Sequence, residues 1–130
     1  MNPILPLEHF VPDVEARQWQ DGRMYLYGSY DISGGTSYCS YELRTFSSAD
    51  MVHWQDHGVS FRSTGLDTRV PWADALLFAP DCVYKNGLYH LFFCLSNNTE
   101  GVAVSTNPTG PFTQAVPVDG ADGDAIDPAV

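Results

Sequence analysis

The 130-residue sequence has few basic residues, few cysteines and no long apolar run. Six Lys and Arg residues stand against 16 Asp and Glu, which gives a formal net charge of -10. Because such a surface repels phosphate backbones and anionic lipid headgroups, we expect neither a nucleic acid nor a membrane as a partner. No apolar stretch approaches the roughly 20 residues of a membrane-spanning helix. A neutral polymer such as a polysaccharide would be indifferent to this charge.

Cysteines and targeting signals are also scarce. Three cysteines, Cys39, Cys82 and Cys94, make no disulfide framework. Cys82 and Cys94 lie inside apolar runs, so we expect buried free thiols there. Segment 1–6 has neither the basic start nor the apolar core of a signal peptide, which predicts a cytoplasmic protein, or a secreted one if an export signal has been removed. The four histidines lack the spacing of metal ligands, so no metal site is predicted.

Helical periodicity is almost absent, and short runs rich in Tyr, Phe, Val and Leu alternate with Gly, Pro, Asn, Asp and Ser. This pattern predicts an all-β chain of many short strands. Asp21-Gly22 and Asn86-Gly87 are strong hairpin-turn signals. We expect the first three strands of two sheets at 11–16, 23–27 and 41–47, and at 79–84, 88–95 and 101–105, with Trp54 and Phe112 in or beside the fourth strands.

The expected strands form an internal repeat of roughly 60–65 residues, a period that favours propellers or arrays. In both copies a serine is followed seven positions later by an aromatic residue, Ser47 by Trp54 and Ser105 by Phe112. Each copy therefore predicts a four-stranded antiparallel sheet, one blade of a β-propeller. Within a single domain of 1–130, we place blade 1 at about 8–60, blade 2 at about 76–118 and the start of a third at about 125. A β-sandwich of two sheets is the alternative.

Three aspartates occupy the same position in the repeat. Asp13, Asp81 and Asp127 each lie beside a proline at the entrance to a first strand. First strands line the central channel of a propeller, so these side chains should point toward one another. Convergent carboxylates destabilise a fold through mutual repulsion, which favours a functional role for the set. For each aspartate alone, an Asx turn or a strand-start cap is the alternative.

An ordered series of motifs resembles glycoside hydrolase family 43. The motifs are Asp13 and the segments 21–31, 48–58, 78–81, 101–105, 108–112 and 126–128. Together they run over essentially the whole chain. The resemblance implies a five-bladed β-propeller, of which this chain covers about the first two blades and the start of a third. It also implies hydrolysis of β-xylosides or α-L-arabinofuranosides with inversion, so the expected partner is an oligo- or polysaccharide.

Carried over residue by residue, the resemblance makes Asp13 the general base. Asp127 becomes the carboxylate that tunes the pKa of the general acid and holds it in place. The acid is a glutamate of a later blade in the family, so we expect it beyond Val130 and expect the chain to be an incomplete enzyme. Inverting glycosidases place their two carboxyl groups roughly 6.5–9.5 Å apart to admit a water. Val14 and Phe78 depart from the family's usual proline and tryptophan, which leaves the subfamily open.

Four further residues are predicted to bind substrate. Asp81 matches a family position that is structural or lines the site. Trp72, in the connection before the second blade, could stack on a sugar ring, with core packing as the alternative. Tyr30 and Asp31 follow a strand end and are expected to face the channel.

No cofactor is predicted, although family members sometimes hold a cation such as calcium in the channel, with ligands expected beyond Val130. The alternative to an enzyme is a function of a different class. It is a carbohydrate-binding or scaffold module that kept the propeller repeat and lost catalysis.

Overall fold

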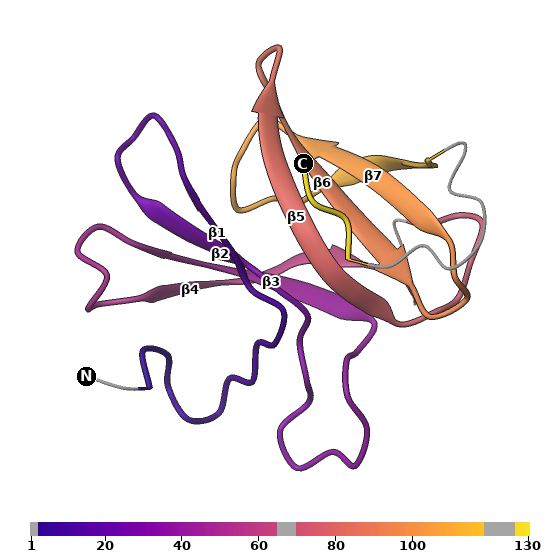
Figure 1. The fold of residues 1–130 in the computed structure, drawn as a ribbon, viewed down its shortest axis with the longest axis horizontal. Coiled ribbons are helices and arrows are strands. Elements are labelled where there is room, and N and C mark those ends of the chain that lie inside the picture. Colours follow the sequence, from indigo (N-terminus) through magenta and orange to yellow (C-terminus); the bar gives the residue numbers. More distant parts are fainter. Residues whose placement is uncertain (1–2, 65–69, 119–126) are drawn as a thin grey trace.

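The chain folds into two four-stranded antiparallel sheets in a computed structural model that describes residues 3–64, 70–118 and 127–130. The first sheet consists of β1 (Glu15–Gln18), β2 (Met24–Tyr27), β3 (Glu42–Ser48) and β4 (Gln55–Arg62). The second consists of β5 (Leu77–Lys85), β6 (Leu88–Leu95), β7 (Glu100–Ser105) and β8 (Thr113–Pro117). Strands pair in chain order in both sheets, and β1 and β2 lie beside β5 (Figure 1). No helix within the described ranges is long and apolar enough to cross a membrane.

Both predicted hairpin turns are confirmed. Asn86 and Gly87 are the two residues between β5 and β6, and their φ angles of 53° and 84° are those of a type I′ turn. Asp21 and Gly22 lie in the five-residue connection between β1 and β2, where Gly22 has φ 77° and its N–H donates to the Trp19 carbonyl at 3.0 Å. These turns set the register between β1 and β2 and between β5 and β6.

The first strand of the first sheet begins later than the sequence indicates. It was expected from residue 11, but β1 begins at Glu15. Asp13 has φ 53°, a left-handed conformation that interrupts an extended strand, and Pro12 has no N–H to donate to a ladder. The first strand of the second sheet, β5, is longer than expected and contains a register shift between Phe78 and Asp81.

One hydrophobic core spans the two sheets. Side chains that alternate along the strands point to the same face, so each sheet contributes every second residue. The largest fully buried members of this core include Tyr27, Phe61, Phe93 and Phe112. The rings of Phe61 and Phe93 meet across the sheets with centroids 4.7 Å apart. The three cysteines are buried and unpaired, which confirms the prediction for Cys82 and Cys94.

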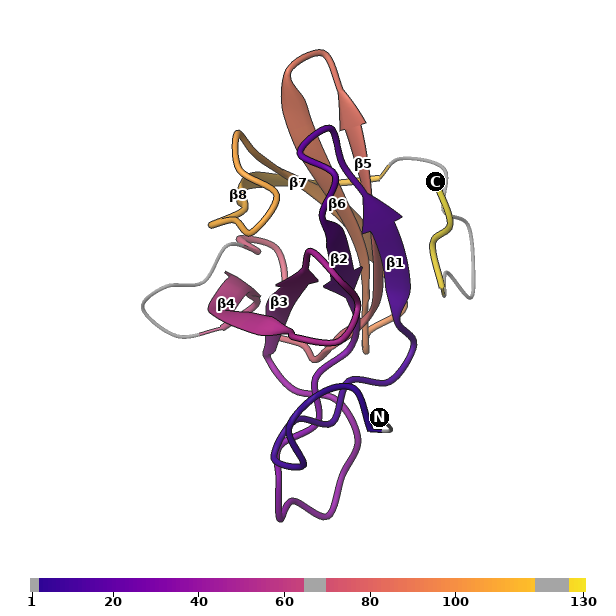
Figure 2. The same ribbon diagram turned by 90° about the vertical axis from the view of Figure 1, so that its left-hand side faces the viewer.

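Hydrogen bonds to backbone carbonyls also join the sheets at the connection between β7 and β8. The Tyr27 hydroxyl donates to the Pro108 carbonyl at 2.7 Å, and the Phe112 N–H donates to the Ser60 carbonyl at 2.9 Å. At the other side of the molecule, the C-terminal segment 127–130 runs beside β5 (Figures 1 and 2). The segment before β1 and the connection between β2 and β3 project from one end of the sheets (Figure 2).

Candidate active site

Asp13 and Asp127 line the same pocket, which has a volume of about 250 Å³. The pocket forms where the segment before β1, the middle of β5 and the C-terminal segment meet. Its other lining residues are Val14, Glu15, Ala79, Pro80, Pro128 and Ala129. The structure therefore brings together the two aspartates predicted to be catalytic, although they are 114 positions apart in the sequence. Their catalytic roles stay predictions.

A buried serine orients Asp13. The Ser29 hydroxyl donates to Oδ2 of Asp13 at 3.3 Å and accepts from the Ala79 N–H at 2.8 Å, so it links the aspartate to β5. Next to Ser29, position 28 has room only for glycine. A Cβ on Gly28 would lie 2.7 Å from Val11 Cγ1 and 2.9 Å from the carbonyl oxygen of Pro12. The end of β2 thus lets the segment that carries Asp13 pass close enough to receive the serine hydrogen bond.

The second aspartate is held through its backbone. Asp127 has φ 54°, and its N–H donates to Sγ of the buried Cys94 at 3.2 Å. Burial raises the pKa of Cys94 to about 11, so the sulfur is a neutral thiol and a weak acceptor. The predicted start of the third blade, at about residue 125, lies outside the described residues.

Asp81 lies near this pocket but does not line it. Its side chain has no exposed surface, and Arg17 of β1 forms a two-pronged ion pair with it. No part of the carboxylate is open to a ligand. The geometry favours a structural role for Asp81, the first of the two readings that the resemblance offers, and substrate binding by it stays a prediction.

Tyr30 and Asp31 have partners within the protein. The Tyr30 hydroxyl lies 3.1 Å from Nδ1 of His9, and the guanidinium of Arg44 lies 5.4 Å from the centre of its ring. Asp31 accepts from the Cys39 N–H at 2.5 Å through Oδ1. Neither residue lines the pocket of the two catalytic candidates. Their contact with substrate stays a prediction.

Trp72 is packed against the core. Its ring stacks on Phe93 with centroids 6.4 Å apart and an interplanar angle of 18°. A Cβ on Gly101 would lie 2.9 Å from Cζ2 of Trp72. These contacts agree with the packing alternative for this residue, and its role in sugar stacking stays a prediction.

Three residues that organise the site were not predicted from the sequence as site residues: Arg17, Ser29 and Cys94. Only Arg17 carried a signal in the sequence, since basic residues are uncommon in this chain. Serine at a strand end and cysteine in an apolar run are ordinary features. Their partners are far away in the sequence, so spacing could not reveal them.

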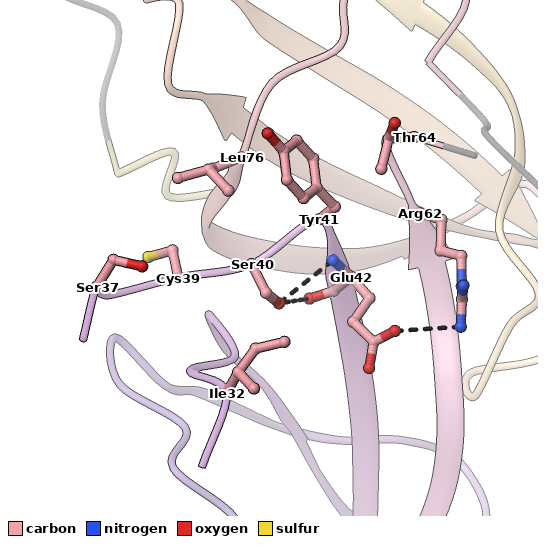
Figure 3. A pocket seen from close by; sticks show the side chains of 9 residues that line it. All are labelled: Ile32, Ser37, Cys39, Ser40, Tyr41, Glu42, Arg62, Thr64 and Leu76. Atoms are coloured by element: carbon pink, nitrogen blue, oxygen red, sulfur yellow. Dashed lines mark hydrogen bonds and ion pairs between the residues drawn. The ribbon is translucent and has the colours of Figure 1, made fainter. Parts of the chain in front are cut away.

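A second pocket, of about 260 Å³, lies at the start of β3 and the end of β4 (Figure 3). Its lining is Ile32, Ser37, Cys39, Ser40, Tyr41, Glu42, Arg62, Thr64 and Leu76. Arg62 donates to a carboxylate oxygen of Glu42 at 3.1 Å, so the two charges satisfy each other (Figure 3). It shares no lining residue with the first pocket, and none of the predicted site residues lies in it.

Within residues 3–64, 70–118 and 127–130, no three His, Cys, Asp or Glu residues gather in a way that would hold a metal ion.

Known proteins resemble this chain over most of its length. The family model for glycosyl hydrolases family 43 matches residues 1–130. The chain is 33% identical over 115 residues to a xylosidase/arabinosidase of Thermoclostridium stercorarium and 33% identical over 124 residues to one of Bacteroides ovatus. Both matches cover 85% of this chain but only 24% and 36% of the relatives. The chain thus spans much less than half the length of these curated relatives.

Solved structures of the family contain the same arrangement of sheets. A β-xylosidase/α-arabinofuranosidase from a compost microbial metagenome, solved with xylotriose in a calcium-free form, matches with a TM-score of 0.72 and 31% identity. The match covers 91% of this chain and 37% of that one. A family 43 enzyme from Xanthomonas citri matches with a TM-score of 0.76 and 28% identity, over 91% of this chain and 36% of that one.

These enzymes are β-propellers, so the two sheets are propeller blades and not the halves of a β-sandwich. A family match over every residue, together with two blades in the arrangement of solved members, shows that the chain belongs to glycoside hydrolase family 43.

Proposed function

We propose that this chain is the N-terminal part of an enzyme that hydrolyses O-glycosidic bonds in plant-polysaccharide pentosides. The substrates are β-xylosides or α-L-arabinofuranosides, and the mechanism is inverting. The observation that carries the proposal is the convergence of Asp13 and Asp127 on one pocket. The names of the relatives, xylosidase/arabinosidase, support the choice of pentosides.

In the proposed reaction Asp13 is the general base. Its carboxylate takes a proton from a water molecule as the water oxygen attacks the anomeric carbon, on the face opposite the leaving group. The bond to the leaving oxygen breaks at the same time, and that oxygen receives a proton from the general acid. Ser29 holds one oxygen of Asp13 by donating a hydrogen bond, which leaves the carboxylate oriented before substrate arrives.

Asp127 acts on the acid and not on the water. A carboxylate beside the acid raises the pKa of the acid by repulsion, so that the acid stays protonated near neutral pH. In this proposal the acid is a glutamate of a later blade, outside the 130 residues. The reaction needs only water and these carboxyl groups, and any channel cation would be held by residues of the later blades.

Activity of the complete enzyme tests the proposal. On p-nitrophenyl β-xyloside and α-L-arabinofuranoside, we expect turnover by the wild type and a fall in kcat of about 10²–10⁴-fold for Asp13→Asn. Proton NMR of the first product should show inverted configuration at the anomeric carbon. Asp50→Asn is the matched control, since Asp50 lies in an exposed turn after β3 and pairs with His53. It should keep full turnover.

Two results would contradict the proposal in different ways. If Asp13→Asn keeps a kcat close to that of the wild type, Asp13 is not the base. If the wild type binds xylo-oligosaccharides but hydrolyses neither glycoside, the protein is a carbohydrate-binding module and not an enzyme.

A further inference from the structure

Asp81 is the one charged residue among the fully buried side chains of the described ranges. Burying a carboxylate is costly unless it is paired and fully hydrogen-bonded. Asp81 meets both conditions. Oδ1 accepts from Nε of Arg17 at 2.9 Å and from the Cys82 N–H at 2.6 Å. Oδ2 accepts from Nη2 of Arg17 and from the Val130 N–H, the latter at 2.9 Å.

The same ion pair engages both backbone groups of Val130. Asp81 accepts the hydrogen bond from its N–H, and Nη2 of Arg17 donates to its carbonyl oxygen at 2.9 Å. The pair therefore bonds to the backbone of Val130 as a neighbouring strand would. Three parts of the chain meet here: β1 through Arg17, β5 through Asp81, and the C-terminal segment through its backbone.

This arrangement exceeds what is needed to join β1 to β5. For that purpose the two-pronged contact between guanidinium and carboxylate would suffice. The additional bonds to Val130 fix a residue three positions after Asp127, a separation of about 10 Å in extended chain. Another attachment of this segment, between described residues, is the bond from the Asp127 N–H to the Cys94 sulfur, which is a weak acceptor. Charge-assisted bonds are roughly twice as strong as neutral ones, so the ion pair is the stronger attachment.

We propose that Arg17 and Asp81 are positioning residues that hold the segment carrying Asp127 in place opposite Asp13. The inference rests on the proposed function, since it gives Asp127 its role in the hydrolysis. Neither Arg17 nor Asp81 touches the substrate. They act through the backbone of Val130, which keeps Asp127 at the pocket that it shares with Asp13.

Truncation of Arg17 in the complete enzyme tests this role. Arg17→Ala should lower kcat by about 10²-fold, because a displacement of about 1 Å of a catalytic group has that effect. KM should change little, since Asp127 acts on the acid in the transition state and not on bound substrate. Added guanidinium ion at a low, non-denaturing concentration should restore part of kcat by refilling the vacated site. Arg17→Lys should recover only part, because an ammonium group cannot make two parallel bonds.

Arg44→Ala is the matched control. Arg44 also pairs with an aspartate in the first sheet, Asp56 at 2.6 Å, and its side chain is 21% exposed against 32% for Arg17. That pair does not line the pocket. Arg44→Ala should keep kcat within about twofold and should not respond to guanidinium.

Hydrogen exchange followed by mass spectrometry gives a readout that does not depend on turnover. The peptide that contains residues 127–130 should exchange faster in Arg17→Ala than in the wild type, and at the wild-type rate in Arg44→Ala. If Arg17→Ala does not fold, Arg17→Lys carries both measurements. Unchanged exchange of this peptide, or an unchanged kcat, would overturn the inference. A wild type without turnover would instead refute the proposed function, while the exchange data still decide whether the ion pair holds the segment.

Discussion

Replacement of Gly101 by alanine should destabilise the fold, because β7 passes directly beneath two aromatic rings. A Cβ at this position would lie 2.5 Å from Cζ and 2.8 Å from Cε2 of Phe93, and 2.9 Å from Cζ2 of Trp72. Carbon atoms in contact prefer about 3.5–4.0 Å, so both rings would have to retreat by about 1 Å. Phe93 is fully buried against Phe61 and has little room to move.

Overpacking of this kind costs about 1–3 kcal/mol. Alanine also restricts the unfolded chain more than glycine does, which offsets about 0.4–1 kcal/mol. We therefore expect a net loss of about 1–2 kcal/mol in the free energy of unfolding of Gly101→Ala. Urea unfolding followed by tryptophan fluorescence measures it as a lower midpoint with an unchanged slope.

The same substitution in a Phe93→Leu variant tests whether the ring causes the loss of stability. Phe93→Leu removes the ring atoms that the new Cβ would meet, so Gly101→Ala should cost clearly less in that background. Equal costs in both backgrounds, or a neutral effect of Gly101→Ala alone, would refute the reasoning. Either result would mean that the Phe93 ring does not determine the cost of a side chain at position 101.

Three further predictions concern the junction, a turn and the thiols. Tyr27→Phe removes the hydrogen bond to the Pro108 carbonyl and should lower the free energy of unfolding by about 1–3 kcal/mol, with an unchanged urea midpoint as the contrary result. Asn86→Val should cost about 1–2 kcal/mol because a β-branched residue disfavours φ 53°, whereas Asn86→Gly should be close to neutral by the same assay. Burial raises the pKa of Cys82 to about 12 and of Cys94 to about 11 from the ordinary 9.0, so neither thiol should react with a disulfide reagent at pH 8 until the protein unfolds. Rapid labelling of the folded protein would contradict the burial of the thiols. Since these pKa values are higher in the folded state, the thiols favour folding fully below pH 9.0 and progressively less as the pH rises toward 11–12.

The parts of the fold that depend on neighbouring residues were predictable. Asn86-Gly87 specifies its turn because both positions must adopt positive φ, and few other dipeptides do so at low cost. The two sheets follow from such turns together with the alternating apolar strands. The start of β1 was harder to predict, because an aspartate is compatible with both extended and left-handed backbone, and at Asp13 the left-handed conformation occurs beside a hydrogen bond from Ser29, which is distant in the sequence.

The candidate site was predictable to a smaller extent. The repeat identified Asp13 and Asp127 as equivalent positions, and the structure brings them to one pocket. The hydrogen bond from Ser29 and the ion pair of Arg17 depend on partners 16 and 64 positions away. Such pairings are a property of the tertiary structure, so neither spacing nor composition in a single sequence indicates them.

The hydrogen bonds at the junction of the two sheets have a consequence for recombination between related propellers. Ser60 and Tyr27 of the first blade bind backbone groups of the connection between β7 and β8, which belongs to the second blade. An exchanged second blade would therefore have to bring its own connection in a matching conformation, or leave the Tyr27 hydroxyl without its acceptor and the Ser60 carbonyl without the Phe112 N–H. Crossover points between such genes should be tolerated best when the first blade and residues 106–112 come from the same parent.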